Sequence, residues 1–81
     1  MQNSANSKVN NLIKLGKYQH YKGNFYNVEG LAIHSETGEK LVVYRPLYGE
    51  QALWVRPLDM FIETVSVSGV MQPRFIFIAA T

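Results

Sequence analysis

Cysteine, long apolar runs and clustered glycines are all missing from this 81-residue sequence. Without cysteine, neither disulfide bonds nor thiolate-zinc sites can form, and the composition fits a reducing compartment. Isolated glycines exclude a glycine-rich phosphate loop. The longest apolar run, Phe75–Ala80, is far shorter than the roughly 20 residues that a transmembrane helix needs. The first eleven residues are too polar for a secretory signal, so we expect a cytoplasmic protein without membrane contact.

Charge is also scarce, because the formal net charge is only +2 and a strongly basic nucleic-acid binder usually carries more. The distribution of the charge is uneven. Before the first acidic residue, Glu29, the chain contains Lys8, Lys14, Lys17 and Lys22. These lysines either protect a sheet edge from unwanted pairing or form a patch that attracts anions. The sequence leaves both interpretations open.

β-Branched and aromatic residues, interrupted by glycine and proline, dominate the chain from Lys17 onward and predict strands. The expected strands are residues 17–22, 25–34, 40–45, 52–56 and 61–67, with a sixth strand or apolar arm at 74–79. Several short strands in one small domain favour a partly open antiparallel barrel, because closure removes exposed sheet edges. We therefore expect an all-β domain over residues 16–81.

Specific turns connect these strands. Gly23 and Asn24 predict a two-residue hairpin turn, and Gly38 predicts a turn that closes in the left-handed conformation. Gly30 interrupts its strand and indicates a bulge. A single helical turn is expected at residues 57–60, and residues 69–73 are expected to form a loop.

The N-terminal residues 1–15 predict a flexible tail with a short helix. Val9, Leu12 and Ile13 recur at helical spacing, and Gly16 suits a left-handed helix cap. Such a helix is too short to be stable alone and must dock on the domain.

No catalytic or metal-binding pattern is convincing. His34, Ser35 and Glu36 contain the residue types of a catalytic triad, but neighbours on a strand point to opposite faces. His20 and His34 lack the short spacing of recognised metal ligands. We expect no catalytic residues, metal or cofactor.

Two interpretations of the strand at residues 52–56 remain open. Because side chains alternate, Leu53 and Val55 share one face while Trp54 and Arg56 share the other. If Leu53 and Val55 fill the core, Trp54 and Arg56 form an exposed pair. Alternatively, Trp54 is the central core residue and Arg56 pairs with a nearby carboxylate.

The segment HYKGNFY, residues 20–26, combines aromatic and basic side chains around the expected hairpin turn. Alternation places His20 and Lys22 on one side of their strand, and Tyr21 on the other as a packing residue. Phenol rings serve both a small core and a stacking surface for bases, prolines or cations. The predicted binding residues are His20, Lys22, Tyr26, His34, Tyr44, Tyr48, Trp54 and Arg56.

Four blocks of sequence resemble an uncharacterised bacterial family, the domain of unknown function 1653. The blocks are GKYQHYKGNFYNVEG, HSETGEKLVVYRPLYG, LWVRPLDMF and PRF, which together span about residues 16–75. The resemblance implies a small SH3-like barrel and implies no activity.

These observations favour a non-enzymatic binding module that recognises a peptide segment or nucleic acid. One alternative is a small-ligand-binding protein or enzyme in which His20, His34 and Arg56 converge on a pocket. Another is a homodimer formed by strand pairing through the apolar arm Phe75, Ile76, Phe77 and Ile78.

Overall fold

A computed structural model of the chain describes residues 12–80, which form seven strands and one short helix. In chain order the elements are β1 (Gly16–His20), β2 (Phe25–Ile33), β3 (Lys40–Pro46), β4 (Trp54–Pro57), α2 (Leu58–Ile62), β5 (Thr64–Val67), β6 (Val70–Pro73) and β7 (Phe75–Ala79). All strand pairs are antiparallel. The prediction of an all-β antiparallel fold is confirmed.

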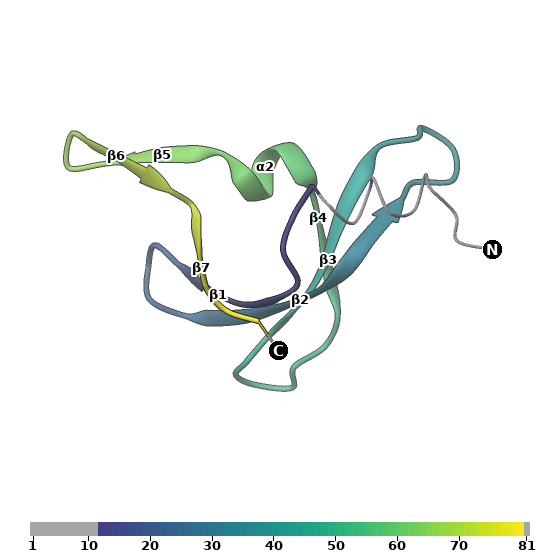
Figure 1. The fold of residues 1–81 in the computed structure, drawn as a ribbon, viewed down its shortest axis with the longest axis horizontal. Helices are drawn as coiled ribbons and strands as arrows, with labels where there is room; N and C mark the ends of the chain where they lie inside the picture. Colours follow the sequence, from purple (N-terminus) through teal and green to yellow (C-terminus); the bar gives the residue numbers. More distant parts are fainter. Residues whose placement is uncertain (1–11, 81) are drawn as a thin grey trace.

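Five strands form one curved sheet in the order β4-β3-β2-β1-β7, and β5 and β6 form a separate two-stranded ribbon (Figure 1). β4 and β7 are the two edges of the sheet and do not pair with each other, so the sheet stays open. The expected partly open barrel is therefore an open sheet of five strands. Its assignment to the SH3 type stays a prediction.

The core lies on one face of the sheet and is covered by α2. Alternation turns Tyr18 of β1, Tyr26 of β2 and Tyr44 of β3 to this face. From α2, Phe61 stacks on Phe75 of β7 with ring centroids 4.0 Å apart and planes inclined by 2°. Each such apolar side chain contributes about 1.5–3 kcal/mol when it leaves water. The buried set is Ile13, Tyr18, Tyr26, Val28, Val42, Tyr44, Leu58, Phe61 and Phe75.

The predicted bulge at Gly30 is confirmed, because the pairing of β2 with β3 shifts between Val28 and Gly30. The shift leaves Glu29 as an extra residue. It also changes which positions face inward, from Val28 before the bulge to Leu31 after it. Without the bulge, the alternation would turn Gly30 inward and Leu31 outward.

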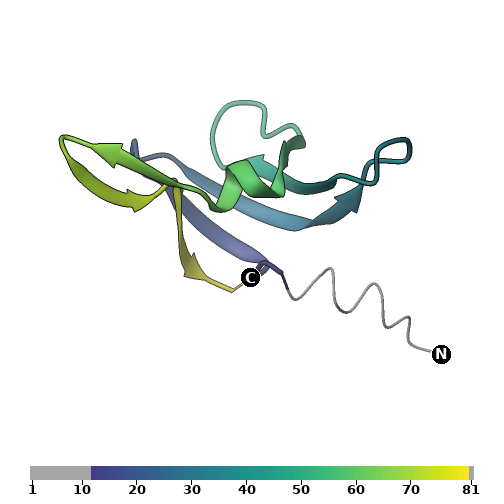
Figure 2. The same cartoon turned by 90° about the horizontal axis from the view of Figure 1, so that it is seen from above.

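Two predictions on the C-terminal side of β4 are wrong. Phe61 begins no strand; it is buried in α2, where Leu58 and Phe61 share the core-facing side at helical spacing. Residues 69–73 are not a loop, because Ser68 and Gly69 both have positive φ and form a tight turn that pairs β5 with β6. The resulting ribbon extends away from the sheet (Figure 2).

Gly16 is the first residue of β1 and not a helix cap. A Cβ at this position would collide with the backbone of Ala79, so glycine permits the close approach of β1 and β7. Residues 12–15 form no helix. The rest of the predicted tail and helix lies outside the described residues.

The apolar arm is divided between the two faces of β7. Phe75 is buried and Phe77 packs against the core, whereas Ile76 and Ile78 remain exposed. The inward residues are therefore occupied by the domain's own core. Only Ile76 and Ile78 are left for contact with another molecule.

Candidate functional site

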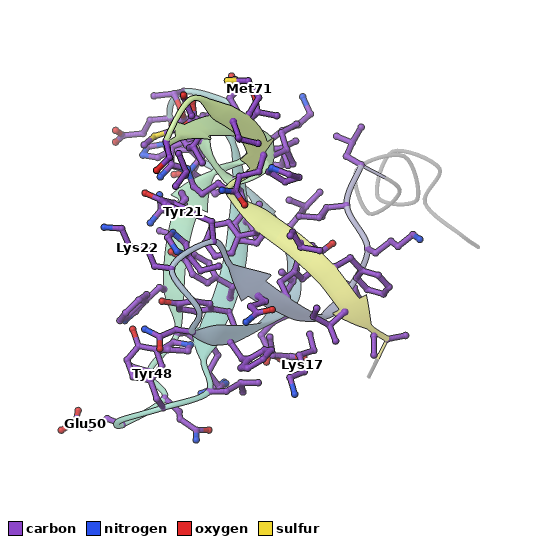
Figure 3. All side chains as sticks on the ribbon, turned by 90° about the vertical axis from the view of Figure 1, so that its left-hand side faces the viewer. Lys17, Tyr21, Lys22, Tyr48, Glu50 and Met71 are labelled. Carbon is purple, nitrogen blue, oxygen red and sulfur yellow. The ribbon has the colours of Figure 1, made fainter. Side chains whose placement is uncertain are left out.

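An aromatic and basic surface lies where the β1–β2 hairpin meets the loop before β4. We call it the aromatic–basic patch, and it consists of His20, Tyr21, Lys22, Tyr48, Trp54 and Arg56. Its floor is formed by the buried rings of Tyr26, Tyr44 and Phe75. Figure 3 shows Tyr21, Lys22 and Tyr48 on one side of the molecule, with Lys17 directed elsewhere. Except for His34, the residues predicted from the sequence come together here.

The β1–β2 hairpin positions the first ring pair of the patch. His20 and Asn24 close the hairpin through the backbone, which makes the loop Tyr21, Lys22 and Gly23. The predicted two-residue turn is therefore wrong. Lys22 N–H donates to His20 Nδ1 at 3.1 Å, and the ring of Tyr21 lies 4.5 Å from that of His20.

This loop also corrects the expected alternation. Tyr21 does not point away from His20, because it has already left the strand; its N–H donates to the carbonyl of Arg74 at 2.9 Å. His20 and Tyr21 thus form one contiguous aromatic surface. Lys22 extends from the loop beside them, exposed to solvent.

Trp54 and Arg56 are placed on the core-facing side of β4 by its register with β3. Trp54 pairs with Tyr44 and Arg56 pairs with Val42, and both partners are buried. Neither interpretation from the sequence is correct. Leu53 and Val55 are exposed and do not fill the core, while Trp54 is 43% exposed and so is not the core centre either.

Trp54 is half-exposed because it lies at the edge of the sheet, against other rings. Its centroid is 6.0 Å from that of Tyr44 and 6.2 Å from that of Tyr26. The ring therefore has one side held by the core and the remainder open to solvent. This arrangement suits a platform on which another ring can stack.

Tyr48 reaches the patch from the loop between β3 and β4. Gly49 and Gln51 both have positive φ and make the loop turn sharply. Leu47 N–H donates to the carbonyl of Phe25 at 2.9 Å, which attaches the loop to β2. The hydroxyl groups of Tyr48 and Tyr26 are hydrogen-bonded at 3.2 Å, so the exposed Tyr48 ring is held against the core.

The Tyr26 hydroxyl has a strongly raised pKa. Burial, followed by the hydrogen bond with Tyr48, raises the pKa of Tyr26 to about 12. The phenol therefore remains protonated across the physiological range. Its role is structural, because a protonated and largely buried hydroxyl can hold Tyr48 but offers no nucleophile.

Arg56 is oriented by the rings of the floor. Its Nε–H donates to the hydroxyl of Tyr44 at 3.2 Å, and its Cζ lies 5.7 Å from the centroid of Phe75. The expected ion pair of Arg56 with a carboxylate is not formed. Glu63 instead accepts from Arg74 Nη2 at 2.6 Å.

The electrostatic surroundings of His20 are positive. Burial is the largest cause that lowers the pKa of His20, and Arg56, Arg74 and Lys22 lower it further by repelling the protonated ring. Three cationic side chains therefore lie near His20. Lys22 and Arg56 would attract an anion bound at the patch, whereas Arg74 is already paired with Glu63.

His34 does not belong to the patch. It follows β2 at the end opposite the β1–β2 loop, and its Nδ1 accepts from the N–H of Glu36 at 3.1 Å and of Thr37 at 3.3 Å (Figure 1). The turn closes on Gly38 with φ 77°, as predicted. Its serine and glutamate neighbours serve this turn, so His34 is a capping residue and shares no pocket with His20 and Arg56.

A small hollow lies at the same end of the sheet as His34. It is lined by Gly38, Glu39, Lys40, Pro57, Leu58 and Asp59. Its charged groups are of both signs and bring together no nucleophile and base. Within residues 12–80, no group of three or more histidine, aspartate or glutamate side chains is arranged to hold a metal ion.

Sequence reasoning missed Arg74 and assigned Tyr21 only to packing. Arg74 approaches His20 because β7 pairs with β1, a contact between distant segments that no local pattern signals. Tyr21 was misplaced because the length of the hairpin loop was misjudged. Tyr26 and Tyr44, predicted as binding residues, are instead buried supports of the patch.

The described part of the chain has no helix that is long and apolar enough to cross a membrane. No curated protein matches the chain significantly. A crystal structure of a protein belonging to DUF1653 from Bordetella bronchiseptica is similar, with a TM-score of 0.77 and 38% sequence identity. The similarity covers 85% of this chain and 91% of that one. The family profile described as "Protein of unknown function (DUF1653)" matches residues 16–77, and the chain therefore belongs to this family.

Proposed function

We propose that the protein is a non-enzymatic binding module that holds an extended ligand, a peptide segment or nucleic acid, on the aromatic–basic patch. The observation that carries the proposal is the convergence of exposed and half-buried rings and cations from separate segments. His20 and Tyr21 come from the first hairpin, Tyr48 from the β3–β4 loop, and Trp54 and Arg56 from β4.

The patch is built as a preorganised surface. Tyr48 is held by the Tyr26 hydroxyl, Trp54 packs on Tyr44, and Arg56 is oriented by Tyr44 and Phe75. Side chains that are already ordered lose little conformational entropy when a ligand binds. Rings exposed on a rigid scaffold are typical of surfaces that recognise prolines, bases or cations.

The geometry does not favour the alternative of an enzyme or a His/Arg-lined pocket. That alternative requires His20, His34 and Arg56 to meet, but His34 lies at the other end of β2 and caps a turn. Homodimerisation through the apolar arm stays a prediction, because only Ile76 and Ile78 of that arm are exposed.

Trp54 offers a direct test, because it is the only tryptophan and lies within the patch. Its fluorescence is to be titrated with a proline-rich peptide, an acidic peptide and short single-stranded oligonucleotides. We expect at least one class to give a saturable change. Tyr48→Ala should weaken that binding, whereas Phe25→Ala, which removes a ring from the opposite face, should not.

The same titrations followed by ¹H–¹⁵N NMR locate the ligand. Shifts concentrated on residues 20–22 and 47–56 are expected. If no class gives saturable binding, or if the shifts concentrate on the outer face around Phe25, the proposal is wrong.

A further inference from the structure

We propose that the ligand is a single-stranded nucleic acid, whose bases stack on two ring pairs and whose phosphates contact Arg56 and Lys22. This inference rests on the proposed function and specifies its ligand class. The first ring pair is His20 and Tyr21, and the second is Tyr48 and Trp54. Neither pair alone distinguishes a base from a proline, so the argument depends on their arrangement with the cations.

Both ring pairs contact the ring of Tyr26. The Tyr26 centroid is 6.3 Å from that of His20, 5.8 Å from that of Tyr48 and 6.2 Å from that of Trp54. Tyr26 itself is buried, Tyr48 and Trp54 are exposed, and His20 and Tyr21 are half-buried. Bases of a single strand are free to splay apart and stack on such rings, and the interaction tolerates any base because every base has a π-face.

The guanidinium of Arg56 lies on the same face, against the rings that support these pairs. Arg56 is over Phe75, whose centroid is 5.5 Å from that of Tyr26 and 4.9 Å from that of His20. The bond from Nε to Tyr44 is the only hydrogen bond of its side chain within residues 12–80. Its remaining N–H groups are therefore available for the two-pronged contact that guanidinium makes with phosphate.

Carboxylates are distributed away from this guanidinium. Glu29 pairs with Arg45 and Glu63 pairs with Arg74. Glu36 and Glu39 belong to the opposite hairpin, around His34. Asp59, the nearest in sequence, lines the small hollow together with Glu39 and Lys40. Figure 3 shows Glu50 at the outer tip of the β3–β4 loop, beyond Tyr48.

This charge arrangement favours nucleic acid over a proline-rich peptide. A polyproline segment would use the rings but would supply no anion to Arg56 and Lys22. A duplex would supply phosphates but keep its bases stacked inside, out of reach of the rings. A single strand alternates bases with phosphates, and it satisfies both features of the patch.

The number of cations sets the expected salt dependence. Contacts with two or three phosphates predict that log Kobs falls with log[salt] with a slope of about −1.5 to −2, since single strands give about −0.7 per contact. This slope is shallow compared with that of strongly basic proteins. It agrees with a net charge of only +2.

The test is fluorescence anisotropy of labelled eight-nucleotide oligothymidylate and oligouridylate with the full chain, between 50 and 200 mM KCl. An abasic oligonucleotide of equal length supplies the phosphates without bases. We expect it to bind at least about tenfold more weakly, because two stacked bases are lost. The ratio of the two natural oligonucleotides reports whether DNA or RNA is preferred, and binding of either supports the proposal.

Two matched pairs of variants separate the rings from the charges. Tyr48→Ala should weaken binding about fivefold or more, while Phe25→Ala on the opposite face should leave it unchanged. Lys22→Gln should reduce the magnitude of the salt slope by about 0.7, while Lys40→Gln at the far end of β3 should not alter it. Circular dichroism and urea unfolding confirm that each variant is folded.

Several outcomes overturn the inference. Equal binding of the abasic and natural oligonucleotides, or equal competition by a duplex, would show that the rings do not stack bases. Binding of a peptide at Trp54 without binding of any oligonucleotide would refute this inference and leave the proposed function standing. If neither peptides nor oligonucleotides bind at 50 mM KCl, both fail.

Discussion

The hairpins at the two ends of β2 contain the same histidine cap but have different neighbouring residues. Each begins with a histidine whose Nδ1 accepts a backbone N–H from two residues later, Lys22 at one end and Glu36 at the other, both at 3.1 Å. His20, however, packs among aromatic rings and cations, whereas His34 stands beside acidic residues. The same capping contact therefore becomes part of an aromatic and basic surface only where the topology brings other segments to it.

The difference arises from what each hairpin meets in space. The β1–β2 hairpin meets Phe75 of β7, Tyr48 of the β3–β4 loop and Arg56 of β4. The β2–β3 hairpin shares the small hollow with Pro57 of β4 and the start of α2. Local sequence sets the turn, and long-range pairing sets its chemical surroundings.

Removing Phe75, a ring in the floor of the aromatic–basic patch, should have the largest effect on the free energy of unfolding. Phe75→Ala deletes the side chain that contacts His20, Tyr26 and Phe61 together, and it should lower the free energy of unfolding by about 3–5 kcal/mol. Urea unfolding followed by circular dichroism measures the loss. Phe25→Ala, an exposed ring on the outer face, should cost much less; equal losses would mean that Phe75 does not anchor the core.

Truncating the two histidines compares the two hairpins directly. His20→Ala should cost about 2 kcal/mol, because it removes both the contact with Lys22 N–H and the packing on Phe75. His34→Ala should cost about 0.5–1 kcal/mol, since only exposed hydrogen bonds are lost. Urea midpoints of the two variants provide the measurement, and a larger loss for His34→Ala would reverse the comparison.

The stability of the domain should also depend on pH through His20. Because burial and nearby cations lower the pKa of His20, the unfolded chain binds this proton more readily than the folded one. Protonation of His20 therefore does not affect stability well above its ordinary pKa of about 6.5. As the pH drops through that value, the free energy of unfolding falls.

Urea midpoints at pH 7.5 and pH 5.0 test this pH dependence of stability. The loss at pH 5.0 should shrink in His20→Asn, which keeps an acceptor for Lys22 N–H without a titratable ring. An undiminished loss in His20→Asn would show that other groups cause the acid sensitivity.

The smallest effect on stability is expected from the ion pair of Glu63 with Arg74. Glu63→Gln removes the partner of Arg74, and an exposed pair of this kind contributes about 0.5 kcal/mol. The stability change should decrease further in 1 M NaCl. A loss of several kcal/mol that is insensitive to salt would instead indicate that Glu63 supports the base of the ribbon.

Features defined by neighbouring residues were predictable from the sequence. Gly38 indicated the left-handed turn, because glycine adopts a positive φ without strain. Gly30 indicated the bulge, because a glycine inside a strand commonly marks one. The grouping of Tyr48, Trp54 and Arg56 was also recognisable, since aromatic and basic residues recur on one strand and its preceding loop. The blocks that resemble the family also indicated membership correctly.

Features set by register or by distant pairing were not predictable. The face of β4 that points inward is set by the pairing of Trp54 with Tyr44. Alternation along the strand alone allows either face to point inward. Arg74 reaches His20 only through the pairing of β7 with β1. Gly16 was mistaken for a cap because the sequence does not reveal that the backbone of Ala79 passes so close.

The pairing of β1 with β7 also determines when the protein can finish folding during its synthesis. β1 is the first strand to be made, and its partner β7 is the last, so the edge of β1 stays open while the rest of the sheet is translated. Phe75 arrives with β7, and until then Phe61 has no ring to stack on. Non-local closure of this kind is slow and leaves apolar surface exposed. A ribosome stalled before Phe75 should therefore carry a nascent chain that remains sensitive to protease, and one stalled well beyond Ala79 should carry a protected domain.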